Sequence, residues 1–403
     1  MHAVTTRIDD GPELRPTAGD QYFWRGPDRS LVGHGVAVRV PLDRADRSVG
    51  VAEAQAVLGG VGRGSDASAP PPVAFAALPF DPDAPGELIV PEVLLDRRVD
   101  GSRWLTALDG SSVDTAMARL LACPGPSTQP TSHELTSVLA PEVWRDEIVA
   151  VVRDRIAAGE LDKAVLAREL RLRTDRPIDV AEVVGRLCDT HPAAMVFAIE
   201  GFVGASPELL VSRHADVVAA HPLAGTAPRR ADPEADRRGA ADLLASTKDQ
   251  WEHRIVIEWF LDELLGFTSY VDAEPEPTII SLPNVHHLGT RIEGRLSSPP
   301  ASVLELVAAL HPTPAVGGRP QRAALAVIAE TERADRGRYA GPVGWVDAAG
   351  DGAFAVGIRS AEIDGTTARL FAGVGVVADS DPAAELAETR AKFGAMMGAL
   401  VRP

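Results

Sequence analysis

The C-terminal segment of the sequence predicts a helix with carboxylates and a lysine on one face. Asp381 is a typical N-cap residue and Pro382 suits the first helical position, so we expect a helix from there to about residue 400. Glu385, Glu388 and Lys392 are spaced i, i+3 and i+7, which places them on one side of that helix. Paired carboxylates of this kind are candidate metal ligands.

A second acidic face occurs in the long helical stretch predicted over 233–266. Asp249, Glu252 and His253 are spaced i, i+3 and i+4, again on one side. Two helices that each present carboxylates supply the oxygen ligands that Mg²⁺ prefers, together with retained waters. Exposed helices carry such pairs routinely, so the spacing alone favours two ordinary solvated faces.

Three short glycine-containing blocks could meet a ligand. Glu208 follows the turn 204–207, a position from which a carboxylate can point into a cleft. The blocks 222–226 and 372–375 contain glycines that let backbone N–H groups approach an anion. Each block alone is more typical of a tight turn or of close strand packing. None is a GxGxxG sequence that opens a helix, so a dinucleotide site is not predicted.

The histidines and Arg359 are ambiguous when taken singly. His286, His287 and His311 show neither HxH nor HExxH spacing, so a zinc site is not predicted. Arg359 ends an apolar alternation that starts at Ala355, where a salt-bridge partner and an anion clamp are equally typical.

Lysine is rare in this sequence. Of the 40 basic residues, only Lys163, Lys248 and Lys392 are lysines. A codon bias toward arginine explains the overall ratio. Lysine can lose its proton or act as a compact point charge, which arginine cannot, so each of the three is a candidate for a role in a site.

Strands joined by short turns, with helices between them, are expected around these residues. Hairpin-length connections favour antiparallel pairing with helices packed outside, so the predicted fold class is α+β. Strands are predicted over 33–41, 72–78, 164–172, 194–200, 208–214, 215–220, 278–296, 344–363 with a break at 350–352, and 368–377. Further helices are predicted over 141–158, 180–188, 301–310 and 320–332.

The composition excludes several classes of protein. The 403 residues are 45% hydrophobic and 24% charged, as in ordinary globular proteins. With 40 basic and 57 acidic residues the net charge is −17 and no basic stripe is present, so nucleic-acid binding is not expected. Cys123 and Cys188 are too few for a cysteine-ligated metal or a disulfide framework. The N-terminus has no apolar signal region and no apolar run reaches about 18 residues, so we expect a cytoplasmic protein without membrane association.

Taken in order, several blocks of the sequence match those of one enzyme family. From about residue 135 onward the chain resembles the chorismate-utilising enzymes, and within them the isochorismate synthases. The resemblance implies that family's large, mostly antiparallel core of two packed sheets flanked by helices. Residues 1–134 would be a variable N-terminal part of the same fold, and residues 135–403 the chorismate-binding catalytic region. The matching blocks are Gly159–Arg168, Phe202–Glu208, Pro222–Thr226, Ser246–His253, His287–Leu288, Leu310–Gly318, Arg338–Gly344, Gly352–Arg359, Ala372–Ser380 and Glu385–Lys392.

The resemblance implies Mg²⁺-dependent conversion of chorismate to isochorismate, in which water adds at C2 and the C4 hydroxyl leaves. Lys163 would be the general base that deprotonates the water, with nearby cations and partial burial favouring its neutral form. Glu208 would be the general acid for the departing hydroxyl, and burial should then raise its pKa. The implied metal ligands are Glu252 and Glu388, bound directly, and Asp249 and Glu385, bound directly or through water.

The resemblance also implies a set of substrate-binding residues. Arg359 would supply a bidentate fork to the enolpyruvyl carboxylate. The complete set is Gly225, Thr226, His287, Ala315, Tyr339, Arg359, Gly373, Gly375 and Lys392.

The choice of subfamily depends on few positions. Ammonia-using relatives, such as anthranilate and aminodeoxychorismate synthases, generally lack a lysine at position 163. The aminodeoxychorismate synthases also carry a nucleophilic lysine where this chain has Ala224. These positions favour water as the nucleophile and a monomer without a glutaminase subunit.

Salicylate synthases are the remaining alternative, because they share Lys163, Glu208 and the metal ligands and then eliminate pyruvate. The small residues at Pro314 and Ala315 favour stopping at isochorismate. The sequence leaves open whether the product serves menaquinone, a siderophore or another salicylate-derived compound.

Overall fold

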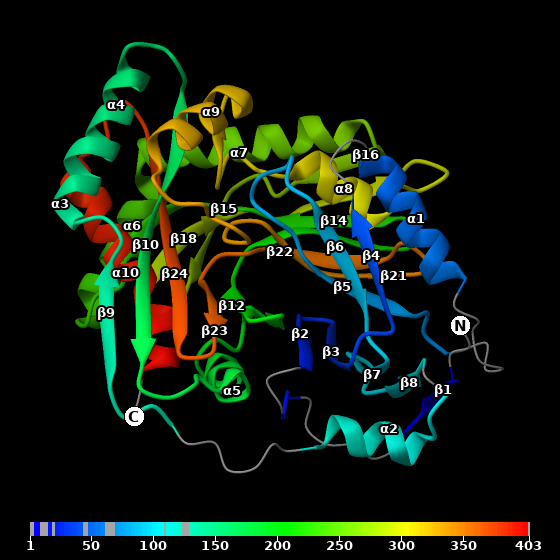
Figure 1. Cartoon of the computed structure of the whole chain (residues 1–403). Helices are drawn as coiled ribbons and strands as arrows, with labels where there is room; N and C mark the ends of the chain where they lie inside the picture. Colours follow the sequence, from blue (N-terminus) through cyan, green and yellow to red (C-terminus); the bar gives the residue numbers. More distant parts are fainter. Residues whose placement is uncertain are drawn as a thin grey trace.

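The computed structural model describes residues 4–8, 15–17, 21–42, 47–60, 69–108, 110–122 and 129–401. These residues form two large sheets and one small sheet with antiparallel pairing, and helices cover their outer faces (Figure 1). The predicted α+β class with two packed sheets is therefore confirmed. The third, three-stranded sheet was not expected.

Strands from both ends of the chain share the two large sheets. The twelve-stranded sheet contains, in spatial order, β1 (Val4–Arg7), β8 (Arg103–Ala107), β7 (Val93–Arg98), β3 (Arg29–His34), β2 (Gln21–Arg25), β11 (Met195–Ile199), β12 (Phe202–Ser206), β23 (Ser360–Asp364), β24 (Thr367–Val376), β10 (Lys163–Thr174) and β20 (Gly318–Arg319), with β9 (His133–Ser137) also paired to β10. The nine-stranded sheet contains β16 (Thr268–Ala273), β19 (Ile292–Leu296), β14 (Val217–His221), β13 (Leu209–His214), β22 (Gly352–Val356), β21 (Pro342–Asp347), β5 (Val73–Ala77), β6 (Gly86–Val90) and β4 (Val38–Leu42). The small sheet contains β15 (Leu223–Pro228), β18 (Val285–Gly289) and β17 (Thr278–Ser281).

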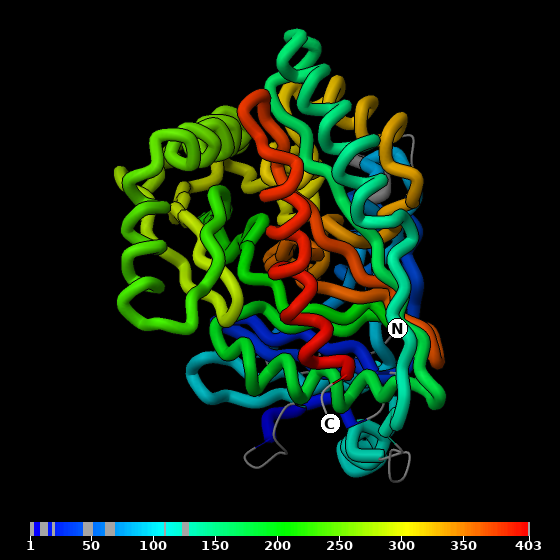
Figure 2. The backbone as a smooth tube through the Cα atoms, turned by 90° about the vertical axis from the view of Figure 1, so that its left-hand side faces the viewer, coloured from blue at the N-terminus to red at the C-terminus, as the bar shows by residue number. Residues whose placement is uncertain are grey.

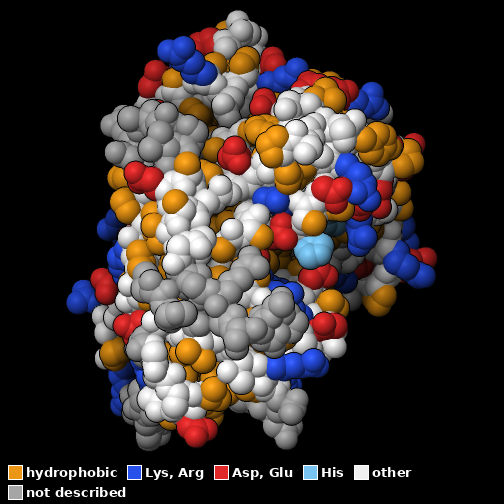
Figure 3. Space-filling view, turned by 90° about the vertical axis from the view of Figure 1, so that its right-hand side faces the viewer, with side chains coloured by type: hydrophobic (Ala, Val, Ile, Leu, Met, Phe, Trp, Pro, Cys, Tyr) orange, Lys and Arg blue, Asp and Glu red, His pale blue; other side chains and the backbone are white. Residues whose placement is uncertain are grey.

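The helices lie outside the sheets, and Figure 2 shows α10 passing between the α6–α7 pair and the α3–α4 segment. Their bounds are α1 (Arg47–Gly59), α2 (Val113–Leu120), α3 (Pro141–Val143), the π-helical turn η1 (Trp144–Val149), α4 (Ala150–Ala157), α5 (Val180–Thr190), α6 (Pro233–Ala245), α7 (Thr247–Leu265), α8 (Val303–Leu310), α9 (Gln321–Thr331) and α10 (Pro382–Leu400). None of the described helices is long and apolar enough to cross a membrane. On the face shown in Figure 3, acidic and basic side chains are interspersed.

The two large sheets pack face to face, and this packing explains why every residue of β11 is apolar. Met195, Phe197 and Ile199 join an aromatic-rich core shared with strands of the nine-stranded sheet. Val196 and Ala198 point to the opposite face, where they pack in the core under α5 and α10. Successive side chains of a strand point to opposite faces, so a strand covered on both sides is buried at every position.

The predicted helix over 233–266 is two helices, because the chain turns at Ser246. This residue has extended backbone angles, and its hydroxyl accepts a hydrogen bond from the Asp249 N–H as the N-cap of α7. The apolar residues keep helical spacing across both helices, so this spacing did not indicate a helix start at Ser246. The break is relevant to the site because Asp249 and Glu252 both belong to the new helix.

Two predicted strands are also divided. The segment 278–296 forms β17, β18 and β19, and the segment 33–41 forms β3 and β4, which belong to different sheets. The break predicted at 350–352 is confirmed, but Arg359, with φ +52°, makes a second turn before β23. A polar–apolar alternation continues through a tight turn, so the period alone does not show where a chain reverses.

The buried Arg29–Asp96 pair predicts a stability effect. Arg29 donates two hydrogen bonds to Asp96, of 2.9 and 2.6 Å, and stacks over Trp345 of the facing sheet. Asp96→Ala leaves a buried cation unpaired, so we expect a loss of about 3–5 kcal/mol in the free energy of unfolding, measured by urea titration. Asp189→Ala is the control, because the Arg15–Asp189 pair is exposed and should contribute less than about 1 kcal/mol. Equal losses in the two variants would contradict this account.

Candidate active site

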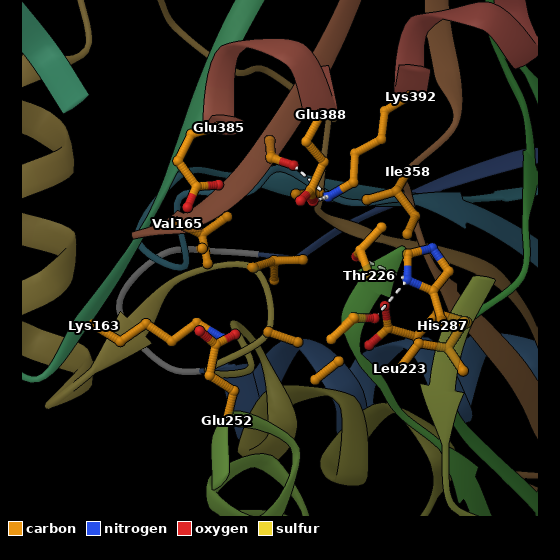
Figure 4. A pocket seen from close by; sticks show the side chains of 18 of the residues that line it. Lys163, Val165, Leu223, Thr226, Glu252, His287, Ile358, Glu385, Glu388 and Lys392 are labelled. Carbon is orange, nitrogen blue, oxygen red and sulfur yellow. Dashed lines mark hydrogen bonds and ion pairs between the residues drawn. The ribbon is translucent and has the colours of Figure 1, made fainter. Parts of the chain in front are cut away.

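All the catalytic, substrate-binding and metal-binding residues that the resemblance implies line one cavity of about 280 Å³. Strands from the twelve-stranded and three-stranded sheets form part of its wall, and α7 and α10 supply four of its five carboxylates (Figure 4). The selected residues on this wall are Lys163, Glu208, Gly225, Thr226, Asp249, Glu252, His287, Ala315, Tyr339, Arg359, Gly373, Gly375, Glu385, Glu388 and Lys392.

Lys163 is the first residue of β10 and is buried, with 3% of its surface exposed. Its side chain passes over Gly375 of β24, where an added Cβ would lie 2.7 Å from the lysine Cε. Its ammonium lies 3.9 Å from a carboxylate oxygen of Glu252 on α7. Figure 4 shows these two side chains approaching each other at one side of the cavity. The missing side chain at 375 therefore makes the position of Lys163 possible.

Glu208 is a fully buried acid between β12 and β13. Burial raises its pKa to about 7, although the positive charges of Arg359, Lys163 and Lys392 act in the opposite direction. Its Oε1 atom has no hydrogen-bond partner among the described residues. A carboxyl group in this state is partly protonated at neutral pH, so it can donate a proton to a bound molecule.

Arg359 is held in place by a neutral histidine. Its Nη2 donates to His287 Nε2 at 3.0 Å, and His287 Nδ1 lies 3.1 Å from the Gly225 carbonyl oxygen. Burial and the neighbouring Arg359 charge hold the pKa of His287 well below its usual value. The histidine therefore accepts from arginine and donates to the carbonyl, which orients the guanidinium at the cavity wall.

Lys392 and Tyr339 converge on Gly373 of β24. The Lys392 ammonium donates to the Gly373 carbonyl at 2.8 Å and pairs with Glu388 at 2.5 Å. Tyr339 is buried, and a Cβ at Gly373 would lie 3.1 Å from its hydroxyl oxygen. Burial raises the pKa of Tyr339, so its hydroxyl stays protonated and can donate. Together with Arg359, these groups form a wall of donors suited to a carboxylate.

The cavity wall also carries four carboxylates from two helices. Asp249 and Glu252 come from α7, and Glu385 and Glu388 come from α10. Burial and the adjacent charge of Glu388 raise the pKa of Glu385 to about 7. These oxygen donors fit Mg²⁺ by their chemistry, and a cation would offset the repulsion between them. No three described His, Cys, Asp or Glu residues are already gathered as a metal centre, so bound water or substrate would have to complete the coordination.

The cavity also contains residues to which we assigned no specific role from the sequence. Lys248, already a candidate because lysine is rare in this chain, is exposed on α7 and lies on the wall. Arg336 is buried against the wall, but nothing distinguished it in the sequence from the many other arginines. His253, which shares a predicted face with Glu252, instead lies 2.7 Å from the Thr290 hydroxyl through Nε2 and does not line the cavity. The remaining unselected residues of the wall are Val165, Leu223, Ala224, Val316, Ala340, Ile358 and Ala384.

Residues 12–401 match the family model described as chorismate binding enzyme. The chain belongs to this family. The family assignment made from the motifs is thereby confirmed.

Relatives of known type give the subfamily. The isochorismate synthase DhbC of Bacillus subtilis is 35% identical over 96% of this chain and 94% of its own length. The isochorismate synthase EntC of Escherichia coli is 34% identical over 81% of this chain and 80% of its own length. These relatives confirm the resemblance to isochorismate synthases and place the chain among enzymes of the isomerase class.

Solved structures agree with the fold. A putative 2,3-dihydroxybenzoate-specific isochorismate synthase, DhbC of Bacillus anthracis, superimposes with a TM-score of 0.82 at 35% identity, covering 95% of this chain and 96% of that chain. MenF, the menaquinone-specific isochorismate synthase of Escherichia coli, gives a TM-score of 0.83 at 26% identity, covering 99% of this chain and 94% of that chain.

The raised pKa of Glu208 predicts how stability depends on pH. Because the folded-state pKa of about 7 exceeds the ordinary 4.5, Glu208 favours the folded state most below pH 4.5. This contribution disappears as the pH rises through 7. The free energy of unfolding of wild type relative to Glu208→Gln should therefore fall by up to about 3 kcal/mol between pH 4.5 and 8. Urea titrations without metal or substrate measure this difference, and a difference independent of pH would contradict the prediction.

Proposed function

We propose that the chain is an isochorismate synthase that uses Mg²⁺ and water to convert chorismate into isochorismate. The observation that carries the proposal is that Lys163 and Glu208, a buried amine and a buried acid, line one cavity in a chorismate-binding enzyme. The isochorismate synthases among its relatives support the same reaction.

Lys163 is the proposed general base. It accepts a proton from the water that attacks C2 of chorismate. In the resting cavity its ammonium lies 3.9 Å from a carboxylate oxygen of Glu252.

Glu208 is the proposed general acid. The new C2–oxygen bond forms, the two ring double bonds shift, and the C4–oxygen bond breaks. Glu208 gives its proton to the departing hydroxyl, which leaves as water. A carboxyl group with a pKa of about 7 suits this step, because it holds the proton near neutral pH and can still release it.

The remaining residues bind the two carboxylates of the substrate. The enolpyruvyl carboxylate meets Arg359, Tyr339, Lys392 and the backbone at Gly373 and Gly375. Gly225 and Thr226 line the ring edge, with His287 holding Arg359. Glu252 and Glu388 would hold Mg²⁺, with Asp249 and Glu385 alongside. The cation supplies positive charge for the ring carboxylate.

Two cavity positions favour water rather than ammonia as the nucleophile. Lys163 is present, and the nucleophilic lysine of aminodeoxychorismate synthases is replaced by Ala224, which lines the cavity. Ala315 leaves a small side chain on the same wall, which favours release of isochorismate over pyruvate elimination.

The product of a single incubation tests the proposal. Purified protein with chorismate and Mg²⁺ should form isochorismate until an equilibrium mixture is reached, and EDTA should stop the reaction. Chromatography of the products measures this. Salicylate and pyruvate in place of isochorismate would make the chain a lyase, and a product formed only with added ammonia would contradict the choice of water as nucleophile.

Two substitutions separate the proton transfer of Lys163 from its charge. Lys163→Ala removes the amine, and Lys163→Arg keeps a cation that does not lose its proton. Both should lower kcat by at least about 10²-fold while Mg²⁺-dependent binding of chorismate persists, as measured by steady-state kinetics and calorimetry. Substantial turnover by Lys163→Arg would show that position 163 supplies charge and not base catalysis.

A further inference from the structure

The edge of β10 beside Lys163 lacks a strand partner over a short length of the described structure. On this edge β20 pairs only with Lys163 and Ala164, and β9 begins to pair at Leu170. Residues 165–169 between them are buried. Buried backbone N–H and C=O groups need partners, so side chains or loops must satisfy this stretch.

Side chains from the segment that follows α9, and from η1, supply several of those partners. The Arg336 guanidinium donates to the Val165 carbonyl at 2.6 Å, and Glu332 accepts from the Ala167 N–H at 2.6 Å. Trp144 completes the edge by donating its indole N–H to the Ala167 carbonyl at 3.0 Å. An ion pair and an indole therefore take the place of a neighbouring strand immediately after Lys163.

The same guanidinium reaches a second part of the cavity wall. Arg336 donates to the carbonyl of Val316 at 3.0 Å, and Val316 and Val165 both line the cavity. Glu332 accepts from Arg336 Nε at 2.8 Å, and the Phe80 ring covers the guanidinium at 4.1 Å. Its planar fork is thus fixed between two backbone carbonyls that belong to different walls.

We propose that the Glu332–Arg336 pair is a positioning device for the reaction, which holds the Lys163 end of β10 at a set distance from the 315–316 wall. The inference rests on the proposed function of Lys163. Lys163 and Val165 point to the same side of β10. The Val165 carbonyl that Arg336 binds is therefore only two residues along the strand from Lys163, the proposed base.

Energetics favour a geometric role for this pair. Glu332 and Arg336 are almost fully buried, with side-chain exposures of 6% and 3%. A buried ion pair adds little net stability over apolar side chains of similar volume, because both charges lose their hydration. What the pair supplies that apolar side chains do not is directed hydrogen bonding to three backbone groups.

Arg338 offers a matched comparison nearby. Its guanidinium also donates to two backbone carbonyls, those of Ile199 and Glu200, each at 3.1 Å, and it pairs with Glu362. It does not line the cavity, and in the described structure its side-chain hydrogen bonds and ion pair go to Ile199, Glu200 and Glu362 and not to β10. In both cases, replacing the arginine by lysine removes the planar guanidinium with its paired hydrogen bonds and keeps the positive charge.

Steady-state kinetics of the two lysine variants test the proposal. Arg336→Lys should lower kcat by about 10²-fold with KM changed less than about threefold, because the base is displaced while substrate contacts remain. Its pH–rate profile should also shift, which a mere loss of folded protein would not cause. Arg338→Lys should keep the kcat and pH profile of wild type. A wild-type kcat and pH profile for Arg336→Lys, or equal effects in the two variants, would overturn the proposal.

Two further measurements keep the result decisive. Circular dichroism and urea unfolding report whether each variant folds, and if Arg336→Lys does not, Glu332→Gln takes its place under the same criteria. Glu332→Gln keeps an acceptor for the Ala167 N–H and weakens only the hold on Arg336. Wild type that makes no isochorismate would defeat the proposed function itself, whereas active wild type with an unaffected variant would defeat only the positioning role.

Discussion

The pairing of β10 with β24 is the interaction on which the cavity depends. The register places Val165 opposite Gly375 and Ala167 opposite Gly373. Because both β24 residues lack side chains, the stem of Lys163 crosses one and the Tyr339 hydroxyl approaches the other. The helix α10 follows β24 and packs on it, so the same strand also sets where the acidic residues of that helix lie. A shift of this register would move the proposed base and the donor wall together.

The surroundings of each ionisable group determine the direction in which its pKa is shifted. Burial raises the pKa of Glu208 to about 7, whereas hydrogen bonds from Thr131 and Ser132 lower the pKa of exposed Asp175 to about 2. His287 is neutral because it is buried beside Arg359. One cavity in a chain of net charge −17 thus combines a donor wall for carboxylates with an acidic wall for a cation.

Buried arginines connect this site to its scaffold. Arg336 ties β10 to the 315–316 wall, and Arg359 is oriented by His287 from the small sheet. Arg29 performs a similar task far from the cavity, where it joins β3 to β7 and packs on the facing sheet. In Arg336 and Arg29 the planar fork satisfies more than one acceptor atom, which a lysine ammonium does less directionally. The few lysines remain available for the cavity itself.

The sequence by itself determined the local features. Asp381 and Pro382 start α10, and the i, i+3 spacing puts Glu385 and Glu388 on one face, because these relations depend only on helix geometry. The motifs also identified the cavity residues before their arrangement was known. Tertiary structure alone decided that the two acidic faces line one cavity, that burial raises the pKa of Glu208, and that Arg336 holds a carbonyl 171 residues away in sequence. These properties arise from contacts and desolvation between distant segments, which no local period or spacing encodes.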